Sequence, residues 1–398
     1  MKFLKKKLRN GMTVIMEKRD LPVVSLSISN PFGGLYEEEK IKGIAHVIEH
    51  SVFTGTKTRT HEQIASEIEK KGGILNAFTA NEVTSFWFKL PSEHLFKGLD
   101  ILTDIINNPT FDEKKFEKEK RVILEEIKMK HDDPSSYVYD KVFEVMYKKP
   151  FGIGIIGTTE SVSGLKRDFV QEYYKNNYNC ANFVVTIVGD GNFDKICAYL
   201  EKNFKSNGKK IKSFKFEKTN GNILEERDGI DQAHFVISMH APLYTDKEHA
   251  TLEVLNAYLA QGMSSKLFLK IREELGLAYT VRGSIDSEKS YSNYNIYVGT
   301  KKESVSKVKE EILKGFEQVE NMNEEELDES KERIIGLGKI TSEESSNVMN
   351  ELLFAELTGD AKTYYNKEGR IKKVKLSDVK KLAKEIIREY STAAIVPK

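Results

Sequence analysis

The segment Gly43–His50 reads G-I-A-H-V-I-E-H and is the most informative stretch of the chain. Its apolar residues recur at helical spacing, and His46 and His50 stand four positions apart. On a helix, residues four apart share one face about one turn from each other. Two imidazoles placed in this way can bind one tetrahedral metal ion. The apolar flanks predict a buried helix, and buried polar side chains need partners, which favours a metal over chance.

Glu49 lies in the same segment, beside His50 and three residues after His46. Its carboxylate can reach a metal-bound water from the same helix. A zinc-bound water has its pKa lowered to about 7, and a nearby carboxylate can take its proton. The order H-x-x-E-H is the inverse of the commoner zinc-peptidase helix. The alternative is a chance pattern that a helix surface would tolerate.

A catalytic zinc ion needs a third protein ligand, and the long charged helix predicted between residues 113 and 130 offers several. Glu119 and Glu126 are seven apart and therefore lie two turns apart on one face. Glu125 points about 100° away from Glu126 and is expected to be solvated. The plainer interpretation makes every one of these glutamates a surface charge, and the residues alone do not choose among them.

The chain is organised as two halves of similar order. We expect strands at 13–16, 23–29, 84–90 and 183–188 in the first half, and at 234–239, 290–298 and 393–396 in the second. Each half ends in a helix followed by a strand, a faint sign of internal duplication. A lysine-rich, turn-rich segment at 206–221 predicts a linker between domains 1–205 and 222–398. The alternative is a solvated hairpin inside one domain.

The composition excludes several classes of protein. Lys and Arg number 62 and Asp and Glu 61 among 398 residues, so the net charge of +1 gives no reason to expect nucleic acid. The two cysteines, Cys180 and Cys197, make no disulfide framework and favour a reducing compartment. We expect no signal peptide, because the apolar run from Met12 to Met16 is short, and the sequence has no apolar run long enough to span a membrane. We expect a cytoplasmic protein without a membrane partner.

Together, these motifs resemble the pitrilysin-like zinc metallopeptidases, the family of insulin-degrading enzyme and mitochondrial processing peptidase. The resemblance covers almost the whole chain and is strongest to the short two-domain bacterial members. It implies one zinc ion per chain, with His46, His50 and Glu126 as its ligands and Glu49 as the general base. By the same resemblance, Glu119 would hold a ligand histidine in its tautomer.

Two further motifs match the family. In the stretch Gly72–Thr79, the resemblance implies that Asn76, Ala77 and Phe78 lie along a bound peptide, as in β-strand addition. The alternative is a Gly-Gly helix end followed by an ordinary strand. In the second half, Arg272 and Tyr279 are similar to the family's Arg/Tyr pair, which would bind the substrate carbonyl end and the developing oxyanion. Without the resemblance, Arg272 would be a surface residue and Tyr279 a core residue.

The resemblance also implies fold, assembly and activity. The expected fold is α+β, with two homologous domains that form half of a clamshell. Each domain is a largely antiparallel sheet packed with helices on one side. We expect a zinc endopeptidase that hydrolyses peptides or unfolded segments inside an enclosed chamber. A homodimer is expected because one chain carries both the zinc motif and the Arg/Tyr pair, and a heterodimer with a homologous subunit stays possible. The alternatives are a non-catalytic or partner-dependent subunit of this fold, or a peptide-binding module with structural zinc.

The chain departs from the family pattern at two places. Ser51 stands where a methionine is common, and Gly262 is the only glycine before the two serines at 264 and 265. Neither position is a ligand, so both bear on substrate preference and loop flexibility and not on zinc binding.

Overall fold

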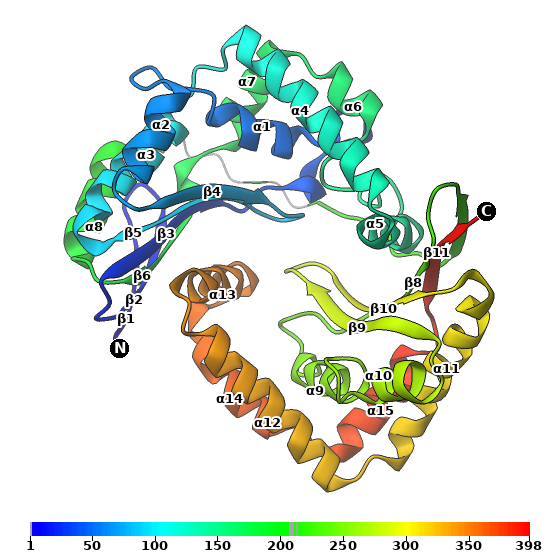
Figure 1. Ribbon diagram of the computed structural model, residues 1–398. Helices are drawn as coiled ribbons and strands as arrows, with labels where there is room; N and C mark the ends of the chain where they lie inside the picture. Colours follow the sequence, from blue (N-terminus) through cyan, green and yellow to red (C-terminus); the bar gives the residue numbers. More distant parts are fainter. Residues whose placement is uncertain (1, 207–210, 212–213) are drawn as a thin grey trace. The chain divides into compact units, whose positions relative to one another are not determined.

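The computed structural model describes residues 2–206, 211 and 214–398 (Figure 1). Contacts divide the chain into two compact units, and neither unit is continuous in sequence. The first unit comprises Met1–Lys128, Ile153–Lys215 and Thr341–Lys362, and the second comprises Met129–Gly152, Phe216–Ile340 and Thr363–Lys398. The boundaries 1–205 and 222–398 stay a prediction, and residues 207–210 and 212–213 of the expected linker at 206–221 lie outside the described residues.

The first unit is built on a six-stranded sheet in the order β1-β2-β6-β3-β5-β4. Strands β2 and β6 pair in parallel and the other neighbours pair antiparallel. The Asn10-Gly11 turn joins β1 to β2, with Gly11 at φ +93°, where glycine is favoured. The strands are β1 (Lys2–Lys7), β2 (Thr13–Lys18), β3 (Val23–Asn30), β4 (Ile74–Thr79), β5 (Thr84–Pro91) and β6 (Val184–Gly189).

Helices cover one face of this sheet and enclose the core of the first unit. Val24, Leu26 and Ile28 alternate along β3 and pack in one apolar cluster with Ile48 and Ile101 from two of these helices. The helices are α1 (Ile44–Val52), α2 (His61–Glu69), α3 (Leu95–Asn107), α4 (Glu113–Asp132), α6 (Thr159–Gly164), α7 (Arg167–Asn177) and α8 (Phe193–Asn203).

A helix from the far end of the chain, α13 (Ser345–Thr358), packs on the opposite face of the same sheet, against β3 and β6. Val24, Leu26 and Ile28 point into the core on the other face. The small residue Ser25 therefore faces α13, and its Oγ lies 2.9 Å from the Oγ of Ser345. The Lys89 ammonium bonds to Glu344 at 2.6 Å beside this contact. Strand β3 is therefore buried on both faces, although α13 lies more than 300 residues further along the chain.

The second unit repeats the plan with a five-stranded sheet in the order β7-β11-β8-β10-β9. Strands β7 and β11 pair in parallel and the other pairs are antiparallel. The strands are β7 (Asn222–Arg227), β8 (Ala233–His240), β9 (Ala278–Ser287), β10 (Ser292–Thr300) and β11 (Ser391–Pro397). The predicted α+β class, with largely antiparallel sheets packed with helices, is confirmed in both units.

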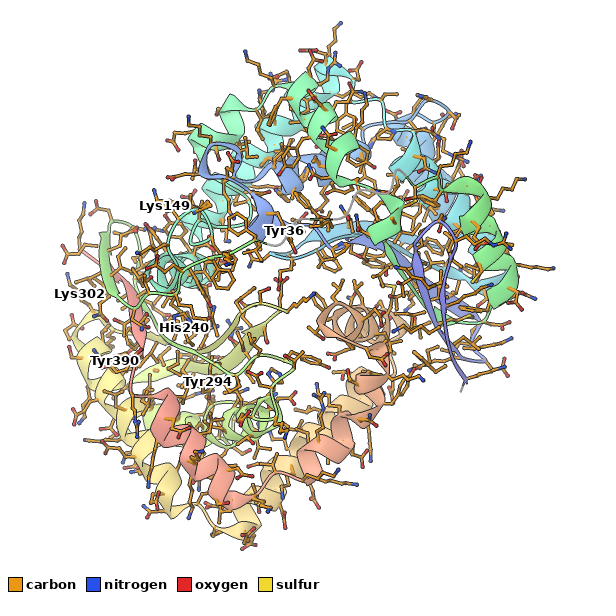
Figure 2. All side chains as sticks on the ribbon, turned by 180° about the vertical axis from the view of Figure 1, so that it is seen from behind. Tyr36, Lys149, His240, Tyr294, Lys302 and Tyr390 are labelled. Atoms are coloured by element: carbon orange, nitrogen blue, oxygen red, sulfur yellow. The ribbon has the colours of Figure 1, made fainter. Side chains whose placement is uncertain are left out.

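Helices cover both faces of the second sheet as well. Tyr294 of β10 points into the main core and packs on Phe316, whereas His240 of β8 faces the other way and contacts Tyr147 (Figure 2). Helix α5 (Pro134–Met146), which comes from the first half of the sequence, covers this second face. The core helices are α9 (His249–Leu259), α10 (Lys266–Phe268), α11 (Val305–Gln318), α12 (Glu324–Thr341), α14 (Lys367–Lys372) and α15 (Leu376–Ile386).

The sequence analysis did not predict helix α5. Helix α4, whose predicted range is 113–130, ends at Asp132, directly before Asp133 and Pro134. A new helix starts directly after it, because Asp133 accepts a hydrogen bond from the Ser135 amide as N-cap and Pro134 occupies the first turn, where proline is tolerated.

Among the described residues, every helix is too short or too polar to cross a membrane.

Candidate metal centre

Helix α1 carries the candidate metal ligands of the first half. Ile44, Ala45, Val47 and Ile48 are fully buried, so one side of this nine-residue helix is committed to the core. His46 and His50 lie on the other side, and their rings stand 4.7 Å apart between centroids. The predicted helical spacing therefore does place both imidazoles on one face.

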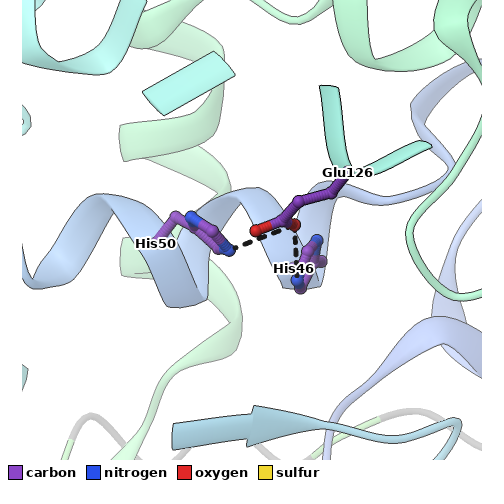
Figure 3. A group of neighbouring side chains, drawn as sticks. All are labelled: His46, His50 and Glu126. Carbon is purple, nitrogen blue, oxygen red and sulfur yellow. Dashed lines mark ion pairs between the residues drawn. The ribbon is translucent and has the colours of Figure 1, made fainter. Parts of the chain in front are cut away.

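Helix α4 brings a carboxylate to these two rings (Figure 3). The Glu126 Oε2 atom lies 3.8 Å from His46 Nε2 and 3.6 Å from His50 Nε2. One donor atom from each of the three residues lies within 4.8 Å of the other two, and no second group of this kind occurs among the described residues. The three side chains are partly exposed, with 14%, 19% and 38% accessibility for His46, His50 and Glu126. Such a group is accessible to an ion and to a substrate.

The donor set fits zinc. Two imidazole nitrogens and one carboxylate oxygen make the His₂Glu set found in catalytic zinc sites, which keep a fourth position open. Donors bound to one zinc ion at about 2.0–2.2 Å are themselves separated by about 3–4 Å, and both His–Glu distances lie in that range.

Glu119, also on α4, contacts one of the two histidines from the side away from Glu126. Its Oε2 atom is 3.4 Å from His50 Nδ1, the ring nitrogen that does not face Glu126. A carboxylate at this nitrogen holds the proton there and leaves Nε2 free to bind a metal. The contact that this role requires of Glu119 is present, and the histidine that it contacts is His50.

Glu125 lies next to Glu126 in sequence but belongs to a different surface. Its side chain is 66% exposed and pairs with Lys128 at 2.8 Å. The helical rotation of about 100° between neighbours separates the two carboxylates. The geometry distinguishes the glutamates that the sequence left open: Glu126 and Glu119 face α1, whereas Glu125 faces solvent.

Glu49 is held by a residue that the sequence analysis missed. The Thr79 hydroxyl of β4 donates a hydrogen bond of 2.5 Å to Glu49 Oε2. Burial raises the pKa of the Glu49 carboxyl, and the bond from Thr79 opposes that rise. The period of two along β4 could have revealed Thr79, because Leu75, Ala77 and Thr79 share the face that packs toward the helices.

The three residues expected to contact a peptide, Asn76, Ala77 and Phe78, all lie on strand β4. It pairs only with β5 and is thus an edge of the sheet. Asn76 is exposed, and Ala77 and Phe78 are half-buried. Phe78 stacks on Phe354 of α13 with centroids 6.3 Å apart, on the face opposite Thr79.

Arg272 and Tyr279 are brought together within the second unit. The Arg272 guanidinium lies 4.8 Å from the centroid of the Tyr279 ring and 4.8 Å from that of Phe268. Arg272 belongs to a π-helical segment, η5 (Leu269–Glu274), a rare geometry frequent at functional sites. Tyr279 is the second residue of the edge strand β9 and is 74% exposed, which is unusual for so large a ring. The sequence did not point to Phe268.

Comparisons with known proteins agree with these observations. The profile of insulinase, peptidase family M16, matches residues 13–159, and the profile of the peptidase M16 inactive domain matches residues 164–334. The first match contains all the residues of the candidate metal centre. The second contains Arg272 and Tyr279.

Similar chains and structures cover nearly the whole protein. A zinc protease of Rickettsia felis, described as uncharacterized, is 34% identical over 82% of this chain and 81% of its own length. The protein YmxG of Bacillus subtilis, also named an uncharacterized zinc protease, is 31% identical over 98% of this chain and 97% of its own. The crystal structure of a protease from Helicobacter pylori has a TM-score of 0.93 at 21% identity, covering 100% of this chain and 99% of that one. The chain therefore belongs to the insulinase family of peptidases, peptidase family M16.

Proposed function

We propose that the protein is a zinc endopeptidase that hydrolyses peptides or unfolded segments. The observation that carries the proposal is the convergence of His46, His50 and Glu126, with a half-buried carboxylate, Glu49, on the helix that carries both histidines. The relatives named zinc proteases support the same class of activity.

Each residue of the centre then has a chemical role. Zinc held by His46, His50 and Glu126 would polarise the scissile carbonyl and acidify a water molecule. Glu49 would take the proton of the attacking water, and the Thr79 hydroxyl would orient the Glu49 carboxylate and favour its ionised form. Glu119 holds the proton on Nδ1 of His50.

The substrate site follows from the edge strand. An extended peptide that pairs with β4 gains backbone hydrogen bonds whatever its side chains are, which suits a peptidase of broad sequence tolerance. Asn76, Ala77 and Phe78 would line that peptide. Arg272 and Tyr279 would bind its carbonyl end and donate a hydrogen bond to the oxyanion. A folded protein cannot offer a free extended strand, so flexible chains are preferred.

We further propose that the protein is cytoplasmic, because the free thiols of Cys180 and Cys197 suit a reducing compartment.

We also propose that the chain forms a homodimer with an enclosed chamber. A relative from Dictyostelium discoideum, 27% identical over 97% of this chain, is named the beta subunit of mitochondrial processing peptidase, so a heterodimer is the alternative assembly. Light scattering combined with activity tests the dimer, because a monomer that cleaves at full rate contradicts it.

The experiment that tests the activity compares the wild type with Glu49→Gln on a mixture of peptides, with products identified by mass spectrometry. The glutamine keeps the shape of the side chain but cannot accept the proton, so we expect bound zinc without cleavage. Glu125→Gln, a change to the exposed neighbour of Glu126, is the matched control and should cleave like the wild type.

The same experiment separates the main alternatives. If neither the wild type nor Glu49→Gln cleaves any peptide, the chain is a non-catalytic or partner-dependent subunit of this fold, or a peptide-binding module. The match of residues 164–334 to an inactive-domain profile is the reason to test this alternative. The residues of the candidate metal centre lie outside the matched range. If both variants cleave equally, the assignment of Glu49 as base is wrong.

A further inference from the structure

Two charged residues that the proposed mechanism does not use are fully buried just before helix α1. Glu37 and Lys42 each have 0% of their surface exposed, and Lys42 Nζ lies 3.7 Å from Glu37 Oε2. Burying charge is costly unless the charges are paired and hydrogen-bonded. The positions of their partners show what this pair does in the fold.

Glu37 satisfies the amino end of α1. Its Oε2 atom accepts a hydrogen bond from the Gly43 amide at 2.9 Å, and its Oε1 atom accepts one from the Ala45 amide at 2.7 Å. The first amides of a helix have no partner within the helix, and a negative charge near them is favourable. The N-cap position itself is Gly43, which has no side chain to supply these acceptors. Glu37 therefore does the work of an N-cap residue from outside the helix.

No ordinary N-cap side chain fits at position 43. Gly43 has φ +93°, and a Cβ atom there would lie 2.5 Å from the carbonyl oxygen of Ile156. The neighbouring backbone is equally close, since a Cβ atom on Gly157 would lie 2.3 Å from the Lys42 carbonyl oxygen. Serine, threonine or aspartate, the usual N-cap residues, would clash here. A carboxylate reaching in from Glu37 is the arrangement that this tight contact allows.

Lys42 holds that carboxylate in place. Its ammonium donates to the Gly34 carbonyl at 2.6 Å and neutralises Glu37, while its own carbonyl accepts a hydrogen bond from Ser161 Oγ at 2.7 Å. Burial raises the pKa of Glu37 and lowers that of Lys42, and the charge of each opposes the shift of the other. Both oxygens of Glu37 accept hydrogen bonds from backbone amides, as suits an ionised carboxylate.

We propose that Glu37 and Lys42 are positioning residues for the metal centre. They fix the first turn of α1, which carries His46, and so hold His46 at the distance from Glu126 that a shared ion requires. A nine-residue helix is too short to be stable by itself, so its first turn depends on such contacts. This inference rests on the proposed function only in so far as α1 carries the metal ligands.

The test uses the full chain with three variants. Glu37→Gln keeps the shape but turns an NH₂ group toward one of the two amide donors. The double variant Glu37→Gln/Lys42→Met removes both charges, so neither is left buried alone, and it serves if the single variant does not fold. Glu17→Gln is the matched control, because Glu17 is also 0% exposed and paired, with Arg19 at 2.5 Å, but lies on β2.

Two measurements read out the positioning role. Competition with a chelator gives the affinity for zinc, and hydrogen exchange of the metal-free protein reports the stability of residues 44–52. We expect both Glu37 variants to bind zinc at least about 10-fold more weakly, the lower end of the effect of residues that orient metal ligands. They should also exchange faster across α1. Glu17→Gln should change neither measurement, even if it lowers the melting temperature.

Two results overturn the proposal. One is unchanged exchange of α1 in both Glu37 variants, and the other is an equal change in Glu17→Gln, which would indicate general destabilisation. If the wild type itself binds no zinc, the proposed function fails, and the exchange of α1 still decides the role of Glu37. A wild type that binds zinc without cleaving peptides likewise contradicts only the peptidase.

Discussion

At the scale of single residues, Glu126 and its neighbour Glu125 show how one helical step separates a candidate metal ligand from a solvent-exposed charge. We predict that Glu126→Gln loses most of its bound zinc, because a neutral amide is a weak ligand for this ion. Glu125→Gln should keep a full zinc content. Metal analysis of the purified variants checks this prediction, and equal zinc in both would contradict the ligand assignment.

Glu119 should behave differently from Glu126, since it contacts His50 and lies outside the group of three candidate ligands. We predict that Glu119→Gln still binds zinc but about 10–100-fold more weakly, the usual effect of removing a carboxylate behind a ligand histidine. Competition with a chelator measures the difference. A complete loss of zinc would make Glu119 a ligand, and an unchanged affinity would make it a surface charge.

Thr79 predicts a pH effect. Its hydrogen bond favours the ionised form of Glu49 and lowers the pKa of that carboxyl, so Thr79→Val should raise the pKa. Glu49 must be ionised to act as a base, so the acidic limb of the pH profile of kcat/KM should move to higher pH. Thr84→Val is the control, because Thr84 lies opposite Thr79 on β5 but bonds to the Phe32 carbonyl. A shift to lower pH, or the same shift in both variants, would contradict the role of Thr79.

At the scale of elements, the contribution of α13 to the stability of the first unit can be measured by substitutions on this helix. Leu352 is fully buried on this helix, whereas the adjacent Glu351 is exposed. We predict that Leu352→Ala lowers the free energy of unfolding by about 2–5 kcal/mol, as is usual for a core leucine. Glu351→Ala should change it by less than about 0.5 kcal/mol. Chemical denaturation measures both, and similar values would show that α13 adds little to the core.

At the scale of the whole molecule, each compact unit needs a helix from the other half of the sequence. A split between Lys215 and Phe216 leaves the first fragment without α13 and the second without α5. We predict that the two fragments copurify when coexpressed, because each covers an open face of the other's sheet. Fragment 1–215 alone should melt at a lower temperature than the pair, and an equal melting temperature would contradict this prediction.

Local sequence patterns determined much of this protein. The H-x-x-E-H spacing and the pattern of the strand expected at 23–29 are short-range signals, and the structure contains the predicted helix and strand. These features depend on residues within a few positions of one another, so the backbone periods of 3.6 and 2.0 are enough to reveal them.

Only the tertiary structure decided the contacts between distant segments. It brought Glu126 to His46 and His50, brought Thr79 to Glu49, placed the Glu37 carboxylate at the first amides of α1 and packed α13 on the first sheet. Each of these pairs joins residues whose separation in the chain carries no periodic signal. Their meeting depends on which faces of the sheet need covering and which buried polar groups need partners, and these are properties of the packed molecule.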